Sequence, residues 1–228
     1  MTARASAATS SDAALPVLVL PAGVVVSPCR PVGAPADWPE LHLRVLQHGL
    51  DCAQALDRDH ARRLARQLLA AQAGAEPAAR LLALPPQQRG GQPASLAHDT
   101  GVTLLAWCGA GAVGVDVVAL ASLADASVEE LQASAALYLG PAVADVVAAA
   151  PDTRAARRLL AGHWAVMEAR LKCLGLALDE WQPAREVLLA SIAWAPVLAT
   201  NLEARQTSDW IGCVAWRNDT PAAPGRCR

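Results

Sequence analysis

Two apolar runs near the middle of this 228-residue chain most constrain its fold. Residues 102–107 and 112–120 are rich in β-branched and other apolar side chains, and Gly109 and Gly111 stand between them. Runs of this length, joined by a short glycine-containing turn, predict two strands that pair with each other. The centre of the chain is therefore expected to form a buried part of a sheet.

The flanking sequence adds helices and further strands. Ser127 and Glu130 have the spacing of a capping box, and Asp152 begins a longer predicted helix that ends just before Gly175. The expected strands cover residues 17–20, 102–107, 112–120, 187–192 and 211–216, and the expected helices cover 41–56, 59–72, a segment from 127 onward and 152–173. This order predicts an α+β fold, because strands and helices come in groups instead of alternating one by one.

Composition indicates a folded protein whose overall charge does not favour binding to polyanions. The chain is 54% hydrophobic and 18% charged, with a formal net charge of -2, so no overall basic field attracts nucleic acid or an anionic membrane. We expect two similar-sized halves, residues 14–115 and 116–217, between disordered tails at 1–13 and 218–228. The apolar stretch 15–26 is broken by prolines and is too short to cross a bilayer. Six scattered cysteines predict reduced thiols and a cytoplasmic location.

Lys172 is the only lysine of the chain, against eighteen arginines. It follows Glu168 by four residues and Trp164 by eight, so the three share one face of a helix. Two readings remain open: an ordinary surface pair, or a position that requires a compact ammonium instead of a planar guanidinium. Asp116 lies inside an apolar run, where an unpaired carboxylate is costly, so it requires a metal, a donor or a strand end. His98 precedes another strand, a place suited to an anion contact or to a structural histidine.

These residues belong to four short motifs in a fixed order. They are Gly91-Gln-Pro93, Ala97-His98-Asp99, Gly114-Val-Asp116-Val-Val118 and Trp164-Ala-Val-Met-Glu168-Ala-Arg-Leu-Lys172. The order resembles that of the 4'-phosphopantetheinyl transferases, whose motifs are Gly-Lys-Pro, Ser-His-Ser, Gly-(Val/Ile)-Asp-x-Glu and Trp-x-x-Lys-Glu-Ala-x-x-Lys. The resemblance covers residues 57–216 and is greatest to the surfactin-synthetase-activating type, which is a monomer of two α/β halves related by a pseudo-twofold axis.

The resemblance implies an activity and a partner. Such enzymes transfer the phosphopantetheine arm of coenzyme A to a serine of an apo acyl or peptidyl carrier protein, and they require Mg²⁺. It also implies roles for individual residues: Asp116 and Glu168 hold Mg²⁺, Lys172 contacts the transferring phosphate, and His98 contacts the coenzyme A phosphates. Arg62, with Arg66 one turn later, either binds the 3'-phosphate or lies on a solvated helix face. Arg89 is close enough in sequence to Gln92 to compensate for the family lysine missing there.

The chain departs from the family pattern at several positions. Val118 replaces a glutamate that serves as a third metal ligand, Met167 and Gln92 replace lysines, and Ala97 replaces a serine. Each lost charged hydrogen bond weakens binding of anionic coenzyme A by about 1–2 kcal/mol. Three interpretations therefore remain open. The first is an active transferase, and the second is a catalytically impaired relative that acts as a carrier-protein or nucleotide-binding accessory protein. The third is an unrelated alanine-rich α+β binding protein whose motif matches are accidental.

Overall fold

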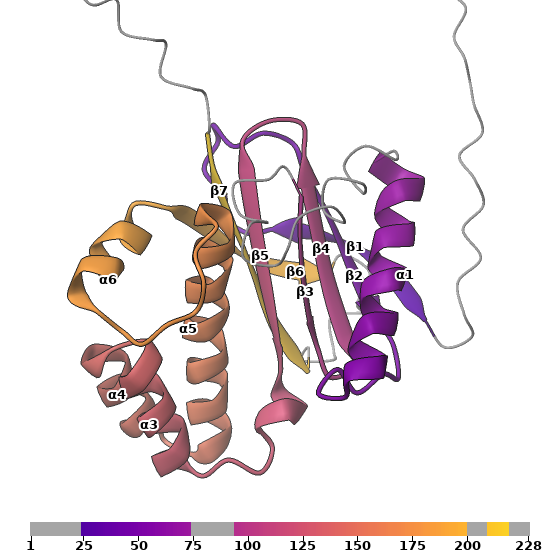
Figure 1. Cartoon of the computed structure of the whole chain (residues 1–228). Coiled ribbons are helices and arrows are strands. Elements are labelled where there is room, and N and C mark those ends of the chain that lie inside the picture. Colours follow the sequence, from indigo (N-terminus) through magenta and orange to yellow (C-terminus); the bar gives the residue numbers. More distant parts are fainter. Residues whose placement is uncertain (1–23, 74–93, 200–208, 219–228) are drawn as a thin grey trace, which may run out of the picture.

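A computed structural model describes residues 24–73, 94–199 and 209–218, which form one antiparallel sheet covered by helices on two sides (Figure 1). The strands are β1 (Val25–Pro31), β2 (Leu41–Gln47), β3 (Ala94–Asp99), β4 (Val102–Cys108), β5 (Ala112–Ala119), β6 (Ala193–Ala199) and β7 (Trp210–Arg217). The helices are α1 (Ala55–Ala73), α3 (Val128–Tyr138), α4 (Pro141–Ala148), α5 (Thr153–Leu174) and α6 (Pro183–Ala190), with a short 3-10 helix η2 (Leu120–Leu123) after β5. The predicted α+β class is confirmed.

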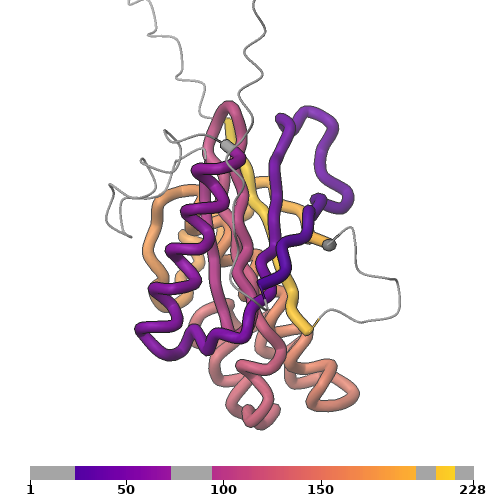
Figure 2. The backbone as a smooth tube through the Cα atoms, turned by 90° about the vertical axis from the view of Figure 1, so that its right-hand side faces the viewer, coloured from indigo at the N-terminus to yellow at the C-terminus, as the bar shows by residue number. Residues whose placement is uncertain are grey.

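The sheet curls until its two ends meet. Its strand order is β3-β4-β2-β1-β6-β7-β5, so β3 and β5 are the outermost strands, yet they lie against each other. Fully buried side chains of β2, β4, β5 and β7, among them Leu43, Leu104, Val115 and Val214, fill the inside of this curve. In the turned view, α1 lies in front of the strands, on the side opposite to α5 (Figure 2).

Helix α5 packs unusually close to β5 because both surfaces are small. Ala161, Ala165, Ala169 and Cys173 recur every four residues along α5 and are all completely buried. They form one stripe, which lies on β5 and β7. Opposite the stripe, a Cβ atom on Gly114 would overlap the carbonyl oxygen of Ala169 and the amide nitrogen of Cys173. Only glycine permits this approach, which brings the neighbouring side chains of α5 close to β5.

Several expected elements are confirmed. Ser127 and Glu130 form the predicted capping box at the start of α3. Asp152 caps α5 by accepting a hydrogen bond from the Ala155 amide, and Gly175 ends the helix in the left-handed conformation. The predicted helix over 59–72 corresponds to α1, and the predicted strand over 211–216 corresponds to β7.

Two predicted elements have the wrong type. The helix expected over 41–56 is in part strand β2, because Leu41, Leu43 and Val45 alternate with His42 and Arg44 in the period of a strand. Both polar side chains lie on the Trp107 ring of the neighbouring strand, His42 stacked and Arg44 over the ring face.

The strand expected over 187–192 is mostly helix α6. Pro183 occupies the first turn of this helix, where its missing amide hydrogen costs nothing. The last two residues of the predicted strand, Ser191 and Ile192, lie between α6 and β6.

The predicted pairing of residues 102–107 with 112–120 is also wrong, although both segments are strands. β4 pairs with β3 on one side and β2 on the other, so both of its edges are already used. The β3–β4 hairpin is made possible by Thr100 and Gly101, a two-residue turn in which Gly101 has a φ of 74°. β5 instead pairs with β7 along all eight residues.

Some expectations lie outside the described residues or stay predictions. The expected strand 17–20, most of both tails and Arg89 fall outside the described ranges. The predicted boundary between residues 115 and 116 falls within β5, and the pseudo-twofold relation between halves stays a prediction. Among the helices that the structure describes, none has both the length and the apolar character needed to cross a membrane.

Candidate active site

A cavity of about 550 Å³ opens where β3, β5 and α5 meet. Its lining includes Arg62 from α1, His98 from β3, Asp116 and Val118 from β5, and Glu168 and Lys172 from α5. Five of the seven residues predicted to form the site therefore face one cavity. Arg66 is not part of its lining, and Arg89 is outside the described residues.

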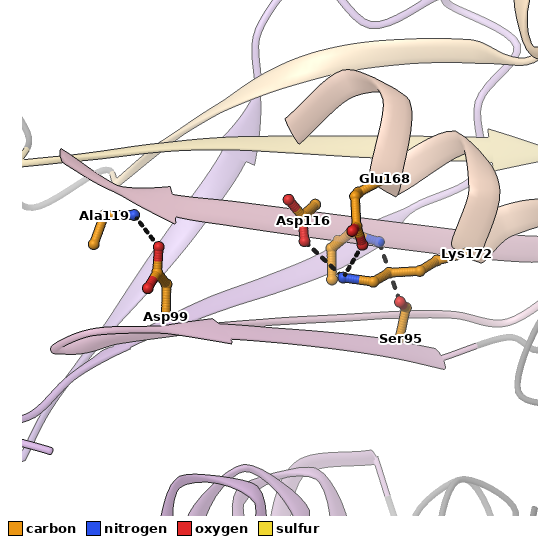
Figure 3. Close-up of polar contacts among 7 residues, drawn as sticks. Ser95, Asp99, Asp116, Ala119, Glu168 and Lys172 are labelled. Atoms are coloured by element: carbon orange, nitrogen blue, oxygen red, sulfur yellow. Dashed lines mark hydrogen bonds and ion pairs between the residues drawn. The ribbon is translucent and has the colours of Figure 1, made fainter. Parts of the chain in front are cut away.

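The centre of the site is an ammonium held by two carboxylates (Figure 3). The Lys172 Nζ donates to Asp116 Oδ1 at 2.6 Å and lies 3.4 Å from Glu168 Oε2. The two carboxylate oxygens are therefore at most about 6 Å apart, although 52 positions separate the residues. Glu168 is on the helix adjoining β5, as predicted. Asp116 is in the middle of β5 and not at its end, so the buried carboxylate relies on Lys172 instead of on a strand terminus.

Burial dominates the electrostatics of Asp116. Removal from water raises the pKa of Asp116 to about 7, Lys172 opposes the rise, and Glu168 adds to it. Burial alone would lower the pKa of Lys172, but Asp116 and Glu168 outweigh burial and raise that pKa. Lys172 stays charged at neutral pH, whereas Asp116 is poised between its two protonation states. A second cation at this point would favour the ionised form.

The raised pKa of Asp116 predicts how stability depends on pH. Between about pH 4 and pH 7 the folded protein holds a proton at Asp116 that the unfolded chain has released, so stability falls as the pH rises through this window. Asp116→Asn should remove that part of the slope. Urea unfolding of both proteins in EDTA at pH 5 and pH 7.5 measures it, and parallel pH profiles would contradict the assignment.

His98 is neutral in the ligand-free site. Burial first, and then the positive charges of Arg62 and Lys172, lower the pKa of His98 to about 4. Its Nδ1 atom is buried and, within the described part of the chain, has no hydrogen-bond partner. An anion arriving here would reverse the effect of the nearby cations and would supply the missing partner. His98 thus fits the role of a phosphate contact that is neutral before the anion binds and offers it a hydrogen bond instead of a charge.

Two of the arginines of α1, Arg62 and Arg66, were predicted to bind a phosphate, and they differ in position. Arg62 reaches the cavity and also contacts Asp59, with Nη1 3.3 Å from Oδ1. Arg66, one turn later, has a buried Nε without a partner among the described residues. Arg62 is therefore the better placed of the two to meet an anion in the cavity.

The donor atoms fit a hard divalent cation with an incomplete protein shell. Asp116 and Glu168 contribute carboxylate oxygens, which suit Mg²⁺, an ion that usually keeps several waters. Within the described ranges, no cluster of three or more histidine, cysteine or acidic residues is arranged for a metal. Val118 is two residues after Asp116 on the same face of β5 and also lines the cavity. The substitution predicted from sequence thus lies beside the two carboxylates.

Four polar residues of this cavity were not predicted as site residues. Ser95, Asp99, Ser122 and Ser134 all line it, and the first two accept hydrogen bonds on β3 from backbone amides of β5. The available signal for Ser95 and Asp99 was their spacing of four residues within one strand, which places both side chains on one face.

Comparison with known families agrees with this geometry. No curated protein matches the chain. A family model described as the 4'-phosphopantetheinyl transferase superfamily matches residues 112–222, which include β5, α5 and β7. The matched segment contains Asp116, Glu168 and Lys172, the three groups that meet in the cavity. Over residues 112–222 the chain is therefore similar to the 4'-phosphopantetheinyl transferase superfamily.

Proposed function

We propose that this protein transfers the 4'-phosphopantetheine arm of coenzyme A to a serine of an apo acyl or peptidyl carrier protein. The superfamily match supports phosphopantetheinyl transfer in general. The observation that carries the proposal is the contact of Lys172 with two carboxylates, one of them buried, in a cavity that also contains His98 and Arg62. This set provides cationic contacts for phosphates next to ligands for a cation, which is what phosphoryl-type transfer requires.

The chain's own residues divide the work as follows. Arg62 and His98 bind the anionic groups of coenzyme A at the α1 and β3 side of the cavity. Lys172 places a compact positive charge against the transferring phosphate and neutralises charge that develops on its oxygens. The carrier serine forms a new phosphorus–oxygen bond as the pyrophosphate bond breaks and 3',5'-ADP leaves. We assign the serine proton to Glu168, because its side chain is 21% exposed, against 9% for Asp116.

Asp116 and Glu168 would hold Mg²⁺ in this enzyme. When bound, the ion supplies positive charge that offsets the negative charge of the pyrophosphate. The raised pKa of Asp116 is consistent with this role, since a buried carboxylate with one ammonium partner gains from a further cation. We further infer a cytoplasmic monomer that acts without nucleic acid or membrane, and size-exclusion chromatography tests the monomer.

Val118 gives a direct test of the metal site. Val118→Glu adds a third carboxylate beside Asp116, so we expect tighter binding of Mg²⁺ and activity equal to or above that of the wild type. Mn²⁺ binding, followed by electron paramagnetic resonance, and carrier-modification rates measure the two effects. Val118→Gln is the matched control, because it has the same length without the charge. Loss of activity in a folded Val118→Glu protein would contradict the two-carboxylate site.

The decisive experiment is incubation with apo carrier protein, coenzyme A and Mg²⁺. Mass spectrometry should show addition of the phosphopantetheine arm to the carrier, and none in the presence of EDTA. Val118, in place of a third ligand, favours the second candidate, an impaired relative that binds a carrier or nucleotide without transfer. That candidate gains support if coenzyme A binds by calorimetry while no carrier is modified.

A further inference from the structure

The sheet is closed by side chains instead of a backbone ladder. β3 and β5 lie against each other, but β3 forms its ladder with β4 and β5 forms its ladder with β7. Ser95 Oγ accepts a hydrogen bond from the Val115 amide at 3.1 Å, and Asp99 Oδ2 accepts one from the Ala119 amide at 2.8 Å (Figure 3). Two contacts, four residues apart on each strand, thus hold the ends of the sheet together.

Asp99 is the stronger of these two contacts. Besides the Ala119 amide, its Oδ2 accepts from the Ser122 hydroxyl at 2.9 Å, and its Oδ1 accepts from the Thr100 amide at 2.6 Å. One carboxylate therefore joins the end of β3, the end of β5 and the short helix η2. Bonds from backbone amides to an ionised acceptor are shorter and stronger than bonds between neutral groups. Asp99 is directly bonded to the segments whose relative position defines the cavity.

The cavity lies between the two contacts. Residues 96–98 of β3 and 116–118 of β5 line it, and both segments fall between Ser95–Val115 and Asp99–Ala119. A direct backbone ladder would bring the strands closer together, because paired strands lie only about 4.7–4.9 Å apart. The side chains of Ser95 and Asp99 contact β5 in place of such a ladder, so the two backbones are not held at that close spacing. His98 and Asp116 both line the cavity beside these strands.

We propose that Asp99 is a positioning residue that fixes β3 against β5, so that His98 faces Asp116 across the cavity. The proposal rests on the proposed function, because it concerns how coenzyme A is held. β5 keeps its place through the ladder with β7 and the packing of α5, so loss of Asp99 should mainly release β3 and His98. Binding of coenzyme A should therefore suffer more than the chemical step at Lys172.

The test compares Asp99→Ala with a control that loses a similar bond elsewhere. We expect Asp99→Ala to raise the KM and the Kd for coenzyme A by about 10²-fold, the upper end of the effect of losing one hydrogen bond to a charged group, with a much smaller change in kcat. Asp99→Asn keeps one acceptor oxygen, so its KM and Kd should lie between those of the wild type and Asp99→Ala. Asp57→Ala is the control, because Asp57 accepts from the Asp51 amide at 2.9 Å and does not line the cavity. It should lose similar stability with an unchanged KM.

Hydrogen exchange separates this inference from the proposed function. The Ala119 amide should exchange faster in Asp99→Ala than in wild type or Asp57→Ala. Unchanged KM, Kd and Ala119 exchange in Asp99→Ala would overturn the positioning role while leaving the transferase proposal intact. Equal changes in KM and kcat would overturn it as well. If wild-type protein bound no coenzyme A, both proposals would fail. If Asp99→Ala does not fold, Asp99→Asn carries the same test, with an expected increase in KM of about tenfold.

Discussion

Lys172→Ala should lower the rate of carrier modification by about 10² to 10³, the range typical for loss of one fixed group that stabilises developing negative charge. Lys172→Arg should restore little of this loss. The Lys172 ammonium lies 2.6 Å from a buried carboxylate and 3.4 Å from a second one, so a larger planar guanidinium displaces one contact or the other. Steady-state rates of carrier modification measure both variants.

Stability measurements separate catalysis from simple pairing at Lys172. Lys172→Ala leaves Asp116 without its partner, so we expect a stability loss of about 1–3 kcal/mol at pH 8. The loss should shrink at pH 5, because protonated Asp116 needs no counter-ion. Lys172→Arg keeps the charge and should retain most of the stability. Arg158→Ala, an exposed position on the same helix, is the control and should change neither quantity. Full activity in Lys172→Ala would refute the assigned role.

The grouping of Asp116, Glu168 and Lys172 was more predictable from sequence than the pairing of the strands. Glu168 and Lys172 are four residues apart on a helix with strong caps, so local rules alone place them together. Asp116 was identifiable because a carboxylate within an apolar run requires a partner. The closeness of Asp116 to these two residues follows from a long-range contact between β5 and α5. In the sequence, only the order of the motifs shared with the family indicated this contact.

The errors in the fold have physical causes. β2 was mistaken for a helix because its apolar residues fit both periods over a short window, and pairing with β4 decides between them. β4 and β5 were expected to pair because they are adjacent in sequence. The tight turn at Gly101 gave β4 an earlier partner in β3, while β5 found β7 from the far end of the chain. Pairing between distant strands leaves no local pattern, and neither does closure by Ser95 and Asp99.

Gly114→Ala should damage both stability and activity, although it adds only one methyl group. The new Cβ would overlap backbone atoms of Ala169 and Cys173, which cannot rotate away as a side chain would. Helix α5 must therefore move away from β5, at a cost of about 1–3 kcal/mol in unfolding free energy. The same movement withdraws Glu168 and Lys172 from Asp116. A shift of about 1 Å at the reacting groups lowers turnover by about 10²-fold.

Two other glycines make the test specific. A Cβ on Gly109 meets no atom within 4 Å, so Gly109→Ala should leave activity unchanged. Gly162 lies on α5 itself with equally open surroundings, and Gly162→Ala should stabilise the protein by about 0.5–1 kcal/mol, the usual gain of alanine over glycine within a helix. Thermal unfolding and carrier-modification rates of the three variants measure the contrast. If Gly114→Ala behaves like Gly109→Ala, the contact between α5 and β5 is looser than the structure indicates. The stripe of small residues on α5 would then not be the feature that brings Lys172 to Asp116.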